Sequence, residues 1–430
     1  MFRYGNELWW MGACRYENDC RTAVLIKVVW IVDGKSANND TRRIAYQFII
    51  MLGLVSLFGD ITYEGARSVT GPFLYTLGAN AAVVGLVAGL GEFLGYALRL
   101  FSGYVADRTG RYWAFAFLGY GLILAIPLLA LAGVWQVAAV FIIAERMGKA
   151  IRAPARDTIL SYATKQVGRG WGFGIHEAMD QIGAVIGPLV VSSMLFLRGG
   201  YRTGFAILVV PALATMAILT VARRKVPAPE TMERSHQKVL SDVGGKLPPV
   251  FWFYTLFAFL SVGGFANFQI IAYHFTVRSV VPAAQIPLLY AIAMGIDALV
   301  ALVIGKTYDR IGLVSLITLP LLTIPIPFLG FSGSYGLAIA GVGLWGAVMG
   351  IQETIMRAAI ADLTPVKRRG LAYGIFNTAY GASWFAGGLV IGILYEHSIG
   401  SVITFAVAMQ VIALPLVFLL HGRSGSSSTR

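Results

Sequence analysis

Charged residues are scarce in this chain. Only 13% of its 430 residues are Asp, Glu, Lys or Arg, whereas 57% are hydrophobic, and the mean hydropathy is +0.71. A water-soluble domain of that composition would expose far more apolar surface than such domains do. Many apolar runs reach the length of about 20 residues that crosses a bilayer as a helix. The sequence therefore predicts an all-α polytopic membrane protein and excludes a soluble domain.

Cysteine and the common catalytic motifs are also scarce. The two cysteines, Cys14 and Cys20, precede the first apolar span and fit neither a zinc pattern nor a disulfide framework. The chain has no Gly-x₄-Gly-Lys-Ser/Thr phosphate loop, no Ser/His/Asp arrangement with supporting spacing and no metal-hydrolase motif. We therefore expect no enzyme, no cofactor and no ATP-driven motor.

Acidic residues are outnumbered by basic ones, 21 against 34, which gives a net charge of +13. The basic residues gather in short loops between apolar spans, a pattern that indicates membrane orientation rather than nucleic-acid binding. Only Arg198, Arg202 and Arg278 fall on the poorer side. The richer side holds Arg42, Arg43, Arg108, Arg111, Lys165, Arg169, most of the 223–246 segment, Lys306, Arg310, Lys367, Arg368, Arg369 and Arg423. The bias predicts a multi-pass protein of the inner membrane with both termini cytoplasmic.

The apolar spans form two groups of six. The first group lies near residues 45–76, 81–106, 112–133, 136–162, 171–196 and 203–222, and the second near 249–277, 286–306, 313–331, 335–361, 371–394 and 401–420. A stretch rich in Pro, Ser and charge separates them and reads as a linker. The predicted organisation is an N-terminal extension (1–41), an N-terminal six-helix bundle (42–222), a cytoplasmic linker (223–248), a C-terminal six-helix bundle (249–421) and a polar tail (422–430).

The two groups are copies of one unit. A charged turn, Gly103-Tyr-Val-Ala-Asp-Arg-Thr-Gly-Arg111, recurs as Gly305-Lys-Thr-Tyr-Asp-Arg-Ile-Gly312. A second block, Arg169-Gly-x₃-Gly-Ile175, recurs as Arg369-Gly-x₃-Gly-Ile375 at nearly the same offset. Two matches at one spacing predict two homologous halves in parallel orientation.

The first 41 residues differ from the rest. Their apolar run, Ala23–Val32, is interrupted by Lys27 and is too short to span a bilayer. No small-residue cleavage site follows it, as one would after a signal peptide. Because Asn38–Arg43 resembles a cytoplasmic lead-in to a first helix, we expect residues 1–41 to be translated upstream sequence from a mis-annotated start.

Twelve helices in two repeats, with Gly-x₃-Asp-Arg-x-Gly-Arg after the second and its echo after the eighth, resemble the major facilitator superfamily over about residues 42–421. The resemblance implies that this loop belongs to a conformational gate whose Asp meets a basic residue at the end of the fourth helix. It pairs Asp107 with Arg156, and Asp309 with Arg357; alternatively, these arginines reach lipid headgroups. The implied gate comprises Gly103, Asp107, Arg108, Gly110, Arg111, Arg156, Asp309, Arg310 and Arg357.

The fifth helix carries Gly174-x₈-Gly183-x₃-Gly187-Pro188, which is similar to the antiporter motif of the superfamily, although Val191 replaces its last glycine. Such glycines let a neighbouring helix approach closely, and the proline bends the helix. The resemblance implies export, and ordinary small-residue packing is the alternative. The fourth helix departs from the drug-exporter pattern Arg-x-x-Gln-Gly-x-Gly, because Arg146 is followed by Lys149 and Ala150.

The fourth helix is unusually charged for a membrane span. Glu145, Lys149, Arg152 and Arg156 follow helical spacing and form one stripe, with Arg146 beside it. Facing lipid, the four charges nearest mid-span would cost on the order of 10 kcal/mol. They must therefore face a wet cavity or one another. Two interpretations stay open: an internal ladder of ion pairs, or a cationic lining for an anionic substrate.

The first helix holds the best candidates for energy coupling. Asp60, Glu64 and Arg67 share one face near mid-span. Close carboxylates favour proton binding by one another, and burial favours it further. We expect this trio to carry the coupling proton; the alternative is a static Glu64–Arg67 pair that serves packing.

Other intramembrane polar residues are predicted to line the cavity. Glu92 and Asp297 lie deep and could pair with Arg67 or with the helix-4 charges. His176, Glu177 and Asp180 suggest metal ligands, but Glu177 lies about 100° from the face of the other two, so we expect no metal. The cavity set comprises Glu92, Glu145, Arg146, Lys149, Arg152, His176, Glu177, Asp180, Asp297, Asn377 and Trp384.

Taken with the resemblance, these features predict a secondary active transporter that works by alternating access. The leading expectation is proton-coupled export, an antiport, of a small organic solute. Uptake or exchange of a small organic anion is the alternative, and a membrane receptor or scaffold that transports nothing is a remote one. The expected partners are the lipid bilayer, the solute and protons, with no nucleic acid, and we expect the protein to be a monomer.

Overall fold

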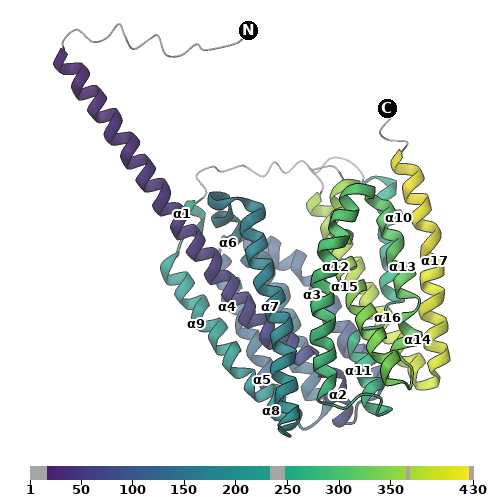
Figure 1. Cartoon of the computed structure of the whole chain (residues 1–430). Coiled ribbons are helices and arrows are strands. Elements are labelled where there is room, and N and C mark those ends of the chain that lie inside the picture. The colour runs from purple at the N-terminus through teal and green to yellow at the C-terminus, as the bar shows by residue number, and fades with distance from the viewer. Residues whose placement is uncertain (1–16, 233–246, 365–368, 426–430) are drawn as a thin grey trace.

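The fold is a pair of helical bundles. The computed structural model describes residues 17–232, 247–364 and 369–425, and every regular element in these ranges is a helix (Figure 1). Helices α1 to α9 form the N-terminal bundle and α10 to α17 the C-terminal one. The prediction of an all-α polytopic membrane protein is confirmed. Cys14 lies outside the described residues.

The N-terminal bundle contains nine α-helices and three short 3₁₀ turns. They are α1 Glu17–Arg67, α2 Thr70–Thr76, α3 Ala81–Thr109, α4 Tyr112–Gly121, η1 Leu122–Leu124, α5 Ala125–Leu128, η2 Leu129–Leu131, α6 Trp135–Val167, α7 Arg169–Phe196, α8 Gly200–Ile207, α9 Val209–Lys225 and η3 Pro229–Met232.

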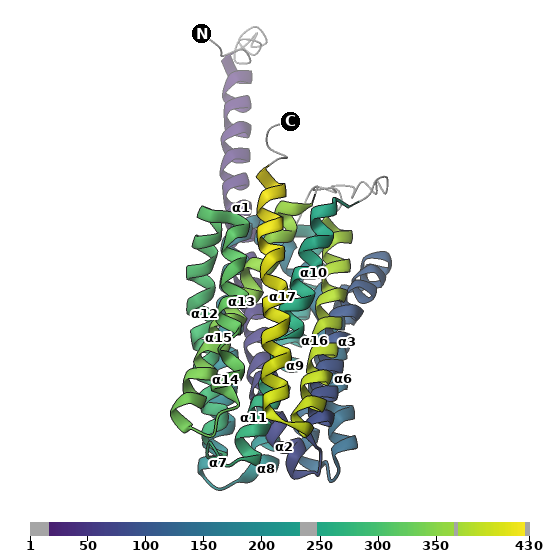
Figure 2. The same cartoon turned by 90° about the vertical axis from the view of Figure 1, so that its right-hand side faces the viewer.

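The C-terminal bundle contains eight α-helices and one 3₁₀ turn among the described residues. It contains α10 Pro249–Gly263, α11 Phe268–Val277, α12 Gln285–Ile311, η4 Gly312–Ile317, α13 Thr318–Thr323, α14 Ile326–Gly330, α15 Tyr335–Leu363, α16 Arg369–His397 and α17 Ile399–Gly425. Helices α10, α16 and α17 pack side by side on one flank (Figure 2).

Ten helical segments among the described residues are long and apolar enough to cross a membrane. The sequence predicts twelve, and the difference arises at two places. The 33 residues of α6 would extend about 50 Å, but their many charges lower the hydropathy. One apolar segment, Gln285–Gly330, is 46 residues long, where two spans are predicted. The count of twelve stays a prediction.

Both bundles begin with a broken helix, which the apolar pattern does not reveal. The predicted span 45–76 is interrupted after Arg67, and a new helix starts at Thr70. The predicted span 249–277 is interrupted after Gly263. There Asn267 caps α11, its side chain accepting a 3.0 Å hydrogen bond from the backbone N–H of Ile270. Hydropathy reveals neither break, because it records composition and not backbone direction.

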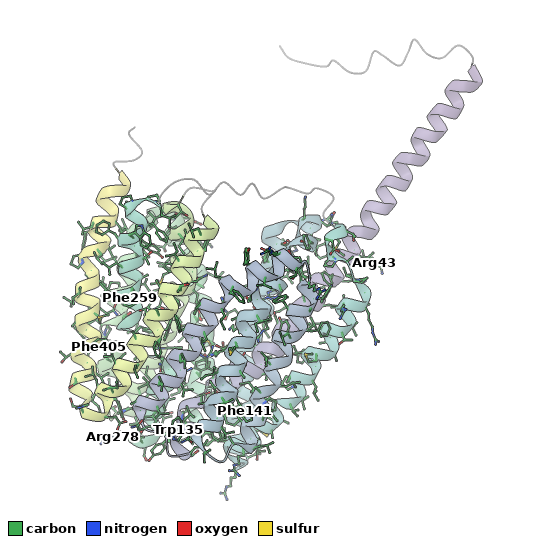
Figure 3. The ribbon with its side chains drawn as sticks, turned by 180° about the vertical axis from the view of Figure 1, so that it is seen from behind. Arg43, Trp135, Phe141, Phe259, Arg278 and Phe405 are labelled. Carbon is green, nitrogen blue, oxygen red and sulfur yellow. The ribbon has the colours of Figure 1, made fainter. Side chains whose placement is uncertain are left out.

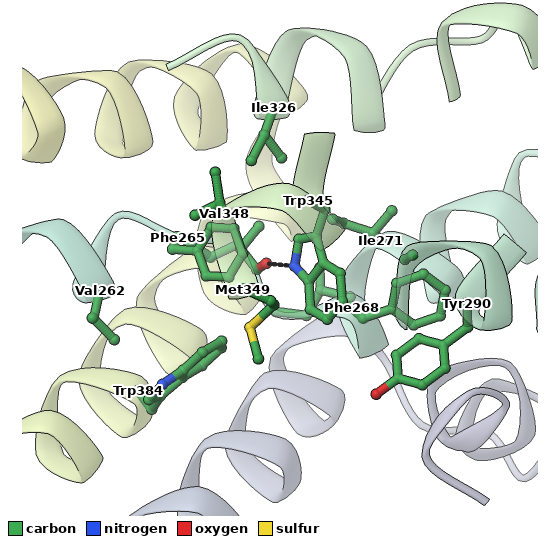
Figure 4. Close-up of a cluster of buried hydrophobic side chains, with 14 of the residues drawn as sticks. Val262, Phe265, Phe268, Ile271, Tyr290, Ile326, Trp345, Val348, Met349 and Trp384 are labelled. Carbon is green, nitrogen blue, oxygen red and sulfur yellow. Dashed lines mark hydrogen bonds between the residues drawn. The ribbon is translucent and has the colours of Figure 1, made fainter. Parts of the chain in front are cut away.

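The break in the C-terminal bundle is held by an aromatic cluster (Figure 4). The indole N–H of Trp345, a fully buried residue of α15, donates a 3.0 Å hydrogen bond to the carbonyl of Ala266. Phe265 stacks on the same indole ring with centroids 5.7 Å apart. A backbone carbonyl that left the helical ladder is thereby satisfied without water.

The two bundles touch at the end of the molecule that carries α2 and α11. The rings of Tyr75 and Tyr273 meet edge to face, with centroids 5.4 Å apart. A Cβ atom at Gly71 would overlap the carbonyl oxygen of Gln269, so the two half-helices are in direct backbone contact. Arg278 marks this closed end, and Arg43 lies at the opposite end (Figure 3).

Candidate functional site

A cavity of about 780 Å³ lies between the bundles. We call it the central cavity. Helices α1, α6 and α7 form one wall, and α12 and α15 form the other. Its charged lining comprises Asp60, Glu64, Arg67, Arg99, Lys149, Arg152, Arg156, Asp157, Glu177, Asp180, Asp297 and Glu353. The lining begins at Arg67, which lies just before α2. It reaches Gly174, five residues after the start of α7. The cavity therefore extends away from the closed end.

A smaller space of about 50 Å³ adjoins the central cavity, and we call it the inner niche. Glu64, Arg67 and Lys149 line both spaces. The niche adds a buried aromatic surface, which includes Tyr63 and the predicted cavity residue Trp384. Asn377, also predicted, borders neither space.

The predicted coupling trio of α1 is divided between two environments. The Glu64 carboxylate lies 3.6 Å from the Arg67 guanidinium. It also accepts a 2.6 Å hydrogen bond from the hydroxyl of Tyr290, which belongs to the other bundle. Asp60 lines the central cavity, and among the described residues it has neither an ion pair nor a hydrogen bond. Glu64 is thus a structural contact between bundles, whereas Asp60 is available to cavity contents.

The charged stripe of α6 is largely an ion-pair ladder. Arg146 lies 3.1 Å from Glu92 of α3, which also pairs with Arg67 at 3.1 Å. Arg152 lies 3.2 Å from Glu145, and both side chains are almost fully buried. These contacts agree with the interpretation of the stripe as an internal ladder of ion pairs. They also place Glu92 in contact with Arg67 and with α6, as the sequence suggested.

Tyr63 contacts two cations of α6, Arg146 and Lys149. Its hydroxyl accepts a hydrogen bond from Arg146. The Lys149 ammonium lies 4.0 Å from the centroid of the same ring, a cation–π contact. Sequence reasoning missed Tyr63 and Tyr290, because an uncharged tyrosine in a membrane span carries no signal that separates a site residue from packing.

The polar start of α7 forms a network around Ser56. The Ser56 hydroxyl lies 2.9 Å from Nε2 of His176 and accepts a 3.1 Å hydrogen bond from Arg156. Asp180 lies 3.7 Å from both His176 and Arg156. Glu177 lines the central cavity apart from this network. Within the described ranges, no three His, Cys, Asp or Glu side chains are arranged to hold a metal ion.

Asp297 stands alone on the opposite wall. Its side chain is only 3% exposed, and its Oδ1 atom has no hydrogen-bond partner. A Cβ atom at Gly350 would lie 2.9 Å from that oxygen, so α15 covers it closely. No ion pair involves Asp297 among the described residues. Among the described residues, the structure therefore shows no pairing of Asp297 with Arg67 or with the charges of α6, which the sequence had suggested.

The two charged turns have the backbone that their glycines predict. Gly110 ends α3 at φ +65° and Gly312 ends α12 at φ +59°, a conformation that favours glycine. Gly103 packs near Pro154 of α6, Arg108 lies within hydrogen-bond distance of Tyr104, and Arg111 forms the N-cap of α4.

The predicted ion pair between Asp107 and Arg156 is not formed in this conformation. Asp107 accepts a 3.1 Å hydrogen bond from Tyr112. Arg156 instead contacts Asp157 at 2.9 Å and Asp180. In the second half Asp309 and Arg310 are exposed, and the Arg357 side chain lies outside the described residues. Both gate pairs stay predictions.

The glycines of the antiporter-like motif allow close packing of α7 on α1. A Cβ atom at Gly183 would overlap the carbonyl oxygen of Leu57, and one at Gly187 would overlap that of Ile61. Gly174 faces open space, and Pro188 lies inside α7. The structure thus supports the close-approach explanation for two of the three glycines.

Two parallel helical bundles that meet at one end and enclose a charged cavity define a secondary membrane transporter. The chain belongs to the Major Facilitator Superfamily, whose family model matches residues 50–388 and 281–429. An uncharacterized protein of Mycobacterium tuberculosis is 43% identical over 383 residues, which cover 88% of this chain and 93% of that protein.

Two more distant comparisons agree. An uncharacterized MFS-type transporter of Methanocaldococcus jannaschii is 28% identical over 397 residues, covering 89% of this chain and 97% of that protein. The crystal structure of a bacterial homolog to the human lysosomal transporter Spinster, in an inward-facing and unoccupied conformation, superimposes with a TM-score of 0.68. That match covers 88% of this chain and 97% of the other at 16% identity, so it shows the fold alone.

Proposed function

We propose that the protein is a proton-coupled exporter of a small organic solute, working by alternating access in the inner membrane with both termini cytoplasmic. The observation that carries this proposal is Asp60, a carboxylate in the cavity wall without an ion pair or hydrogen bond among the described residues. A proton and a solute can therefore compete for it, which antiport requires. We infer the export direction from the resemblance of Gly174, Gly183, Gly187 and Pro188 to the antiporter motif.

Asp60 lies where its charge is sensed by the rest of the cavity. The charged groups that act on it are the carboxylates of Asp180 and Glu64 and the cations of Lys149 and Arg152. With a proton on Asp60 the cavity loses one negative charge, and the cations of α6 become less well balanced. Protonation thus changes the electrostatic field at the place where a solute sits.

The conformational change requires contacts that exist in one state only. In this structure the bundles are closed at the α2–α11 end, which the arginine bias places outside the cell. When the cavity opens to that side, Asp107 and Asp309 would latch the cytoplasmic side through Arg156 and Arg357. The Glu64–Tyr290 hydrogen bond crosses the bundle interface at mid-depth and links the state of α1 to that of α12.

The experiment that tests this proposal uses everted membrane vesicles with a pH gradient reported by acridine orange. A solute panel is added, and a solute that is exported in exchange for protons dissipates the gradient. Asp60→Asn should abolish this response, whereas the exposed η3 variant Glu230→Gln should respond like the wild type. Gradient dissipation that is unchanged in Asp60→Asn would contradict the role of Asp60.

One observation favours the anion alternative. Lys149 lines both the central cavity and the inner niche, and it has a cation–π contact but no ion pair among the described residues. If the protein transports an organic anion, the flux of that anion should need no pH gradient, and Lys149→Ala should abolish it. A protein that moves no member of the panel in either assay would favour a receptor or scaffold.

A further inference from the structure

Three arginines of the central cavity form ion pairs within the protein. Arg67 pairs with Glu64 and Glu92, and Arg152 pairs with the buried Glu145. Arg156 pairs with Asp157 and Asp180. A solute that approached these arginines would have to displace a carboxylate from each of them.

The acidic side chains of the cavity are not all paired in this way. Asp60 on α1 and Asp297 on α12 line the same cavity from opposite walls, and neither has an ion pair among the described residues. The charged lining contains seven carboxylates, among them Glu177, and five cations, so its formal charge is negative. Lys149 reduces it only in part, because its ammonium is directed at the ring of Tyr63.

Asp297 is the stronger of the two indications of a ligand. An ionised carboxylate that is 3% exposed and has a buried oxygen without a hydrogen-bond partner is costly. Glu353 of α15 lines the same cavity as Asp297, and no cation among the described residues pairs with Asp297. A cation from outside would fill that role.

Much of the wall around Asp297 is apolar, although Glu353 and Thr354 of α15 also belong to it. Met294, Ala298, Ala301 and Leu302 of α12 and Met349 of α15 line the central cavity beside it. Residues 294, 297, 298 and 301 share one face of α12 by helical spacing. Methionine side chains adapt to ligands of different shape. The volume of about 780 Å³ lies within the range of sites that hold drug-sized molecules.

We propose that the exported solute is a monovalent organic cation with an apolar body, its charge held by Asp297 and its body laid against the methionine- and alanine-lined face of α12 and α15. This inference rests on the proposed transport function and names its substrate class. Asp297 holds the charge of the solute on one wall, and the proton of Asp60 lies on the other. The two compete because the bound cation repels a proton across the cavity.

The test is direct binding to the purified full-length protein in nanodiscs without a pH gradient. The probes are tetraphenylphosphonium, ethidium and a quaternary alkylammonium, with tetraphenylborate as an anion of the same size and apolarity as the first. The wild type should bind at least one cation at least tenfold more tightly than tetraphenylborate. Asp297→Asn should lower that affinity at least tenfold, and Asp297→Glu should retain most of it.

Two further variants guard against misfolding. Ala298→Phe narrows the apolar wall without changing charge and should weaken binding of the bulkier cations, whereas Glu230→Gln should bind like the wild type. Binding of tetraphenylborate equal to that of the cations, no binding of any cation, or an affinity unchanged in Asp297→Asn overturns the inference. Cation binding without cation-driven dissipation of a pH gradient would instead sink the proton coupling and leave the substrate class standing.

Discussion

The Glu396 carboxylate accepts a 2.7 Å hydrogen bond from the backbone N–H of Ala81, and the two residues belong to different bundles. Ala81 is the first residue of α3, and Glu396 lies near the end of α16. The carboxylate therefore satisfies a free N–H group at a helix start and lies at the positive end of the helix dipole. A similar hydrogen bond joins the two bundles where α7 meets the start of α12. There the Ser192 hydroxyl donates to the carbonyl of Ala284 at 2.7 Å.

The first prediction concerns this contact. Glu396→Ala should favour opening of the α2–α11 end, because the charge–dipole interaction and hydrogen bond stabilise the closed state by about 1 kcal/mol, roughly a fivefold shift in population. Distances between spin labels placed at the exposed Thr76 of α2 and at the exposed Arg278, which follows α11, would report it. Glu396→Gln keeps a hydrogen-bond acceptor but not the charge. Its distribution of label distances should therefore lie between those of the wild type and Glu396→Ala. A label distribution unchanged in Glu396→Ala would contradict the role of the contact.

The second prediction concerns the hydrogen bond between Tyr290 and Glu64. Tyr290→Phe keeps the ring, which packs on Phe268 with centroids 4.6 Å apart, and removes only the hydroxyl. Loss of one buried interhelical hydrogen bond costs about 0.6–1.7 kcal/mol. Because the bond is present when the α2–α11 end is closed, its loss should shift the population roughly 3- to 20-fold away from that state. The same label distances would measure it.

Tyr308→Phe is the matched control for that variant. Its hydroxyl donates a 2.7 Å hydrogen bond to Asp362, but both residues lie in the C-terminal bundle. It should leave the conformational equilibrium unchanged. If both tyrosine variants shift the equilibrium equally, the bond across the interface has no special part in it.

The third prediction concerns the packing of α7 on α1. Gly187→Ala places a methyl group against the carbonyl oxygen of Ile61, so it should lower the free energy of unfolding by about 1–3 kcal/mol. Gly174→Ala is the control, because the space around Gly174 is open. Thermal unfolding in one detergent would compare them, and equal stability of the two variants would show that α7 can shift without cost.

The fourth prediction concerns the Glu145–Arg152 pair. Arg152→Gln leaves a buried carboxylate without its partner and should destabilise the protein by about 3–5 kcal/mol. The double variant Glu145→Gln/Arg152→Gln removes both charges and should recover part of that loss. A double variant that is less stable than either single one would mean that these groups serve separate partners.

Much of the fold was predictable from the sequence, since composition, charge bias and duplicated motifs all report properties of whole helices. Gly110 and Gly312 also occupy the positive-φ positions expected at charged turns. The helix breaks after Arg67 and Gly263 were not predictable, because the apolar runs continue through them. They depend on tertiary contacts such as the Trp345–Ala266 hydrogen bond.

The site was predictable only as a set of candidates. Helical spacing placed Asp60, Glu64 and Arg67 on one face, but it could not show that Tyr290 of the other bundle holds Glu64. Nor could it show that Asp297 has no ion pair with any residue that the structure describes. Both facts depend on how the two halves meet, and no periodicity within one helix contains that information.

The repeated break also bears on the history of the chain. Gly65 contacts Gly187 as Gly263 contacts Gly387, which matches α1 with α10 residue by residue. A break near the same point in both halves agrees with the predicted duplication of one unit. On this register Asp60, Glu64 and Arg67 correspond to Ala258, Val262 and Phe265, all buried apolar residues. The first helix of one half thus carries charge where the first helix of the other half is apolar.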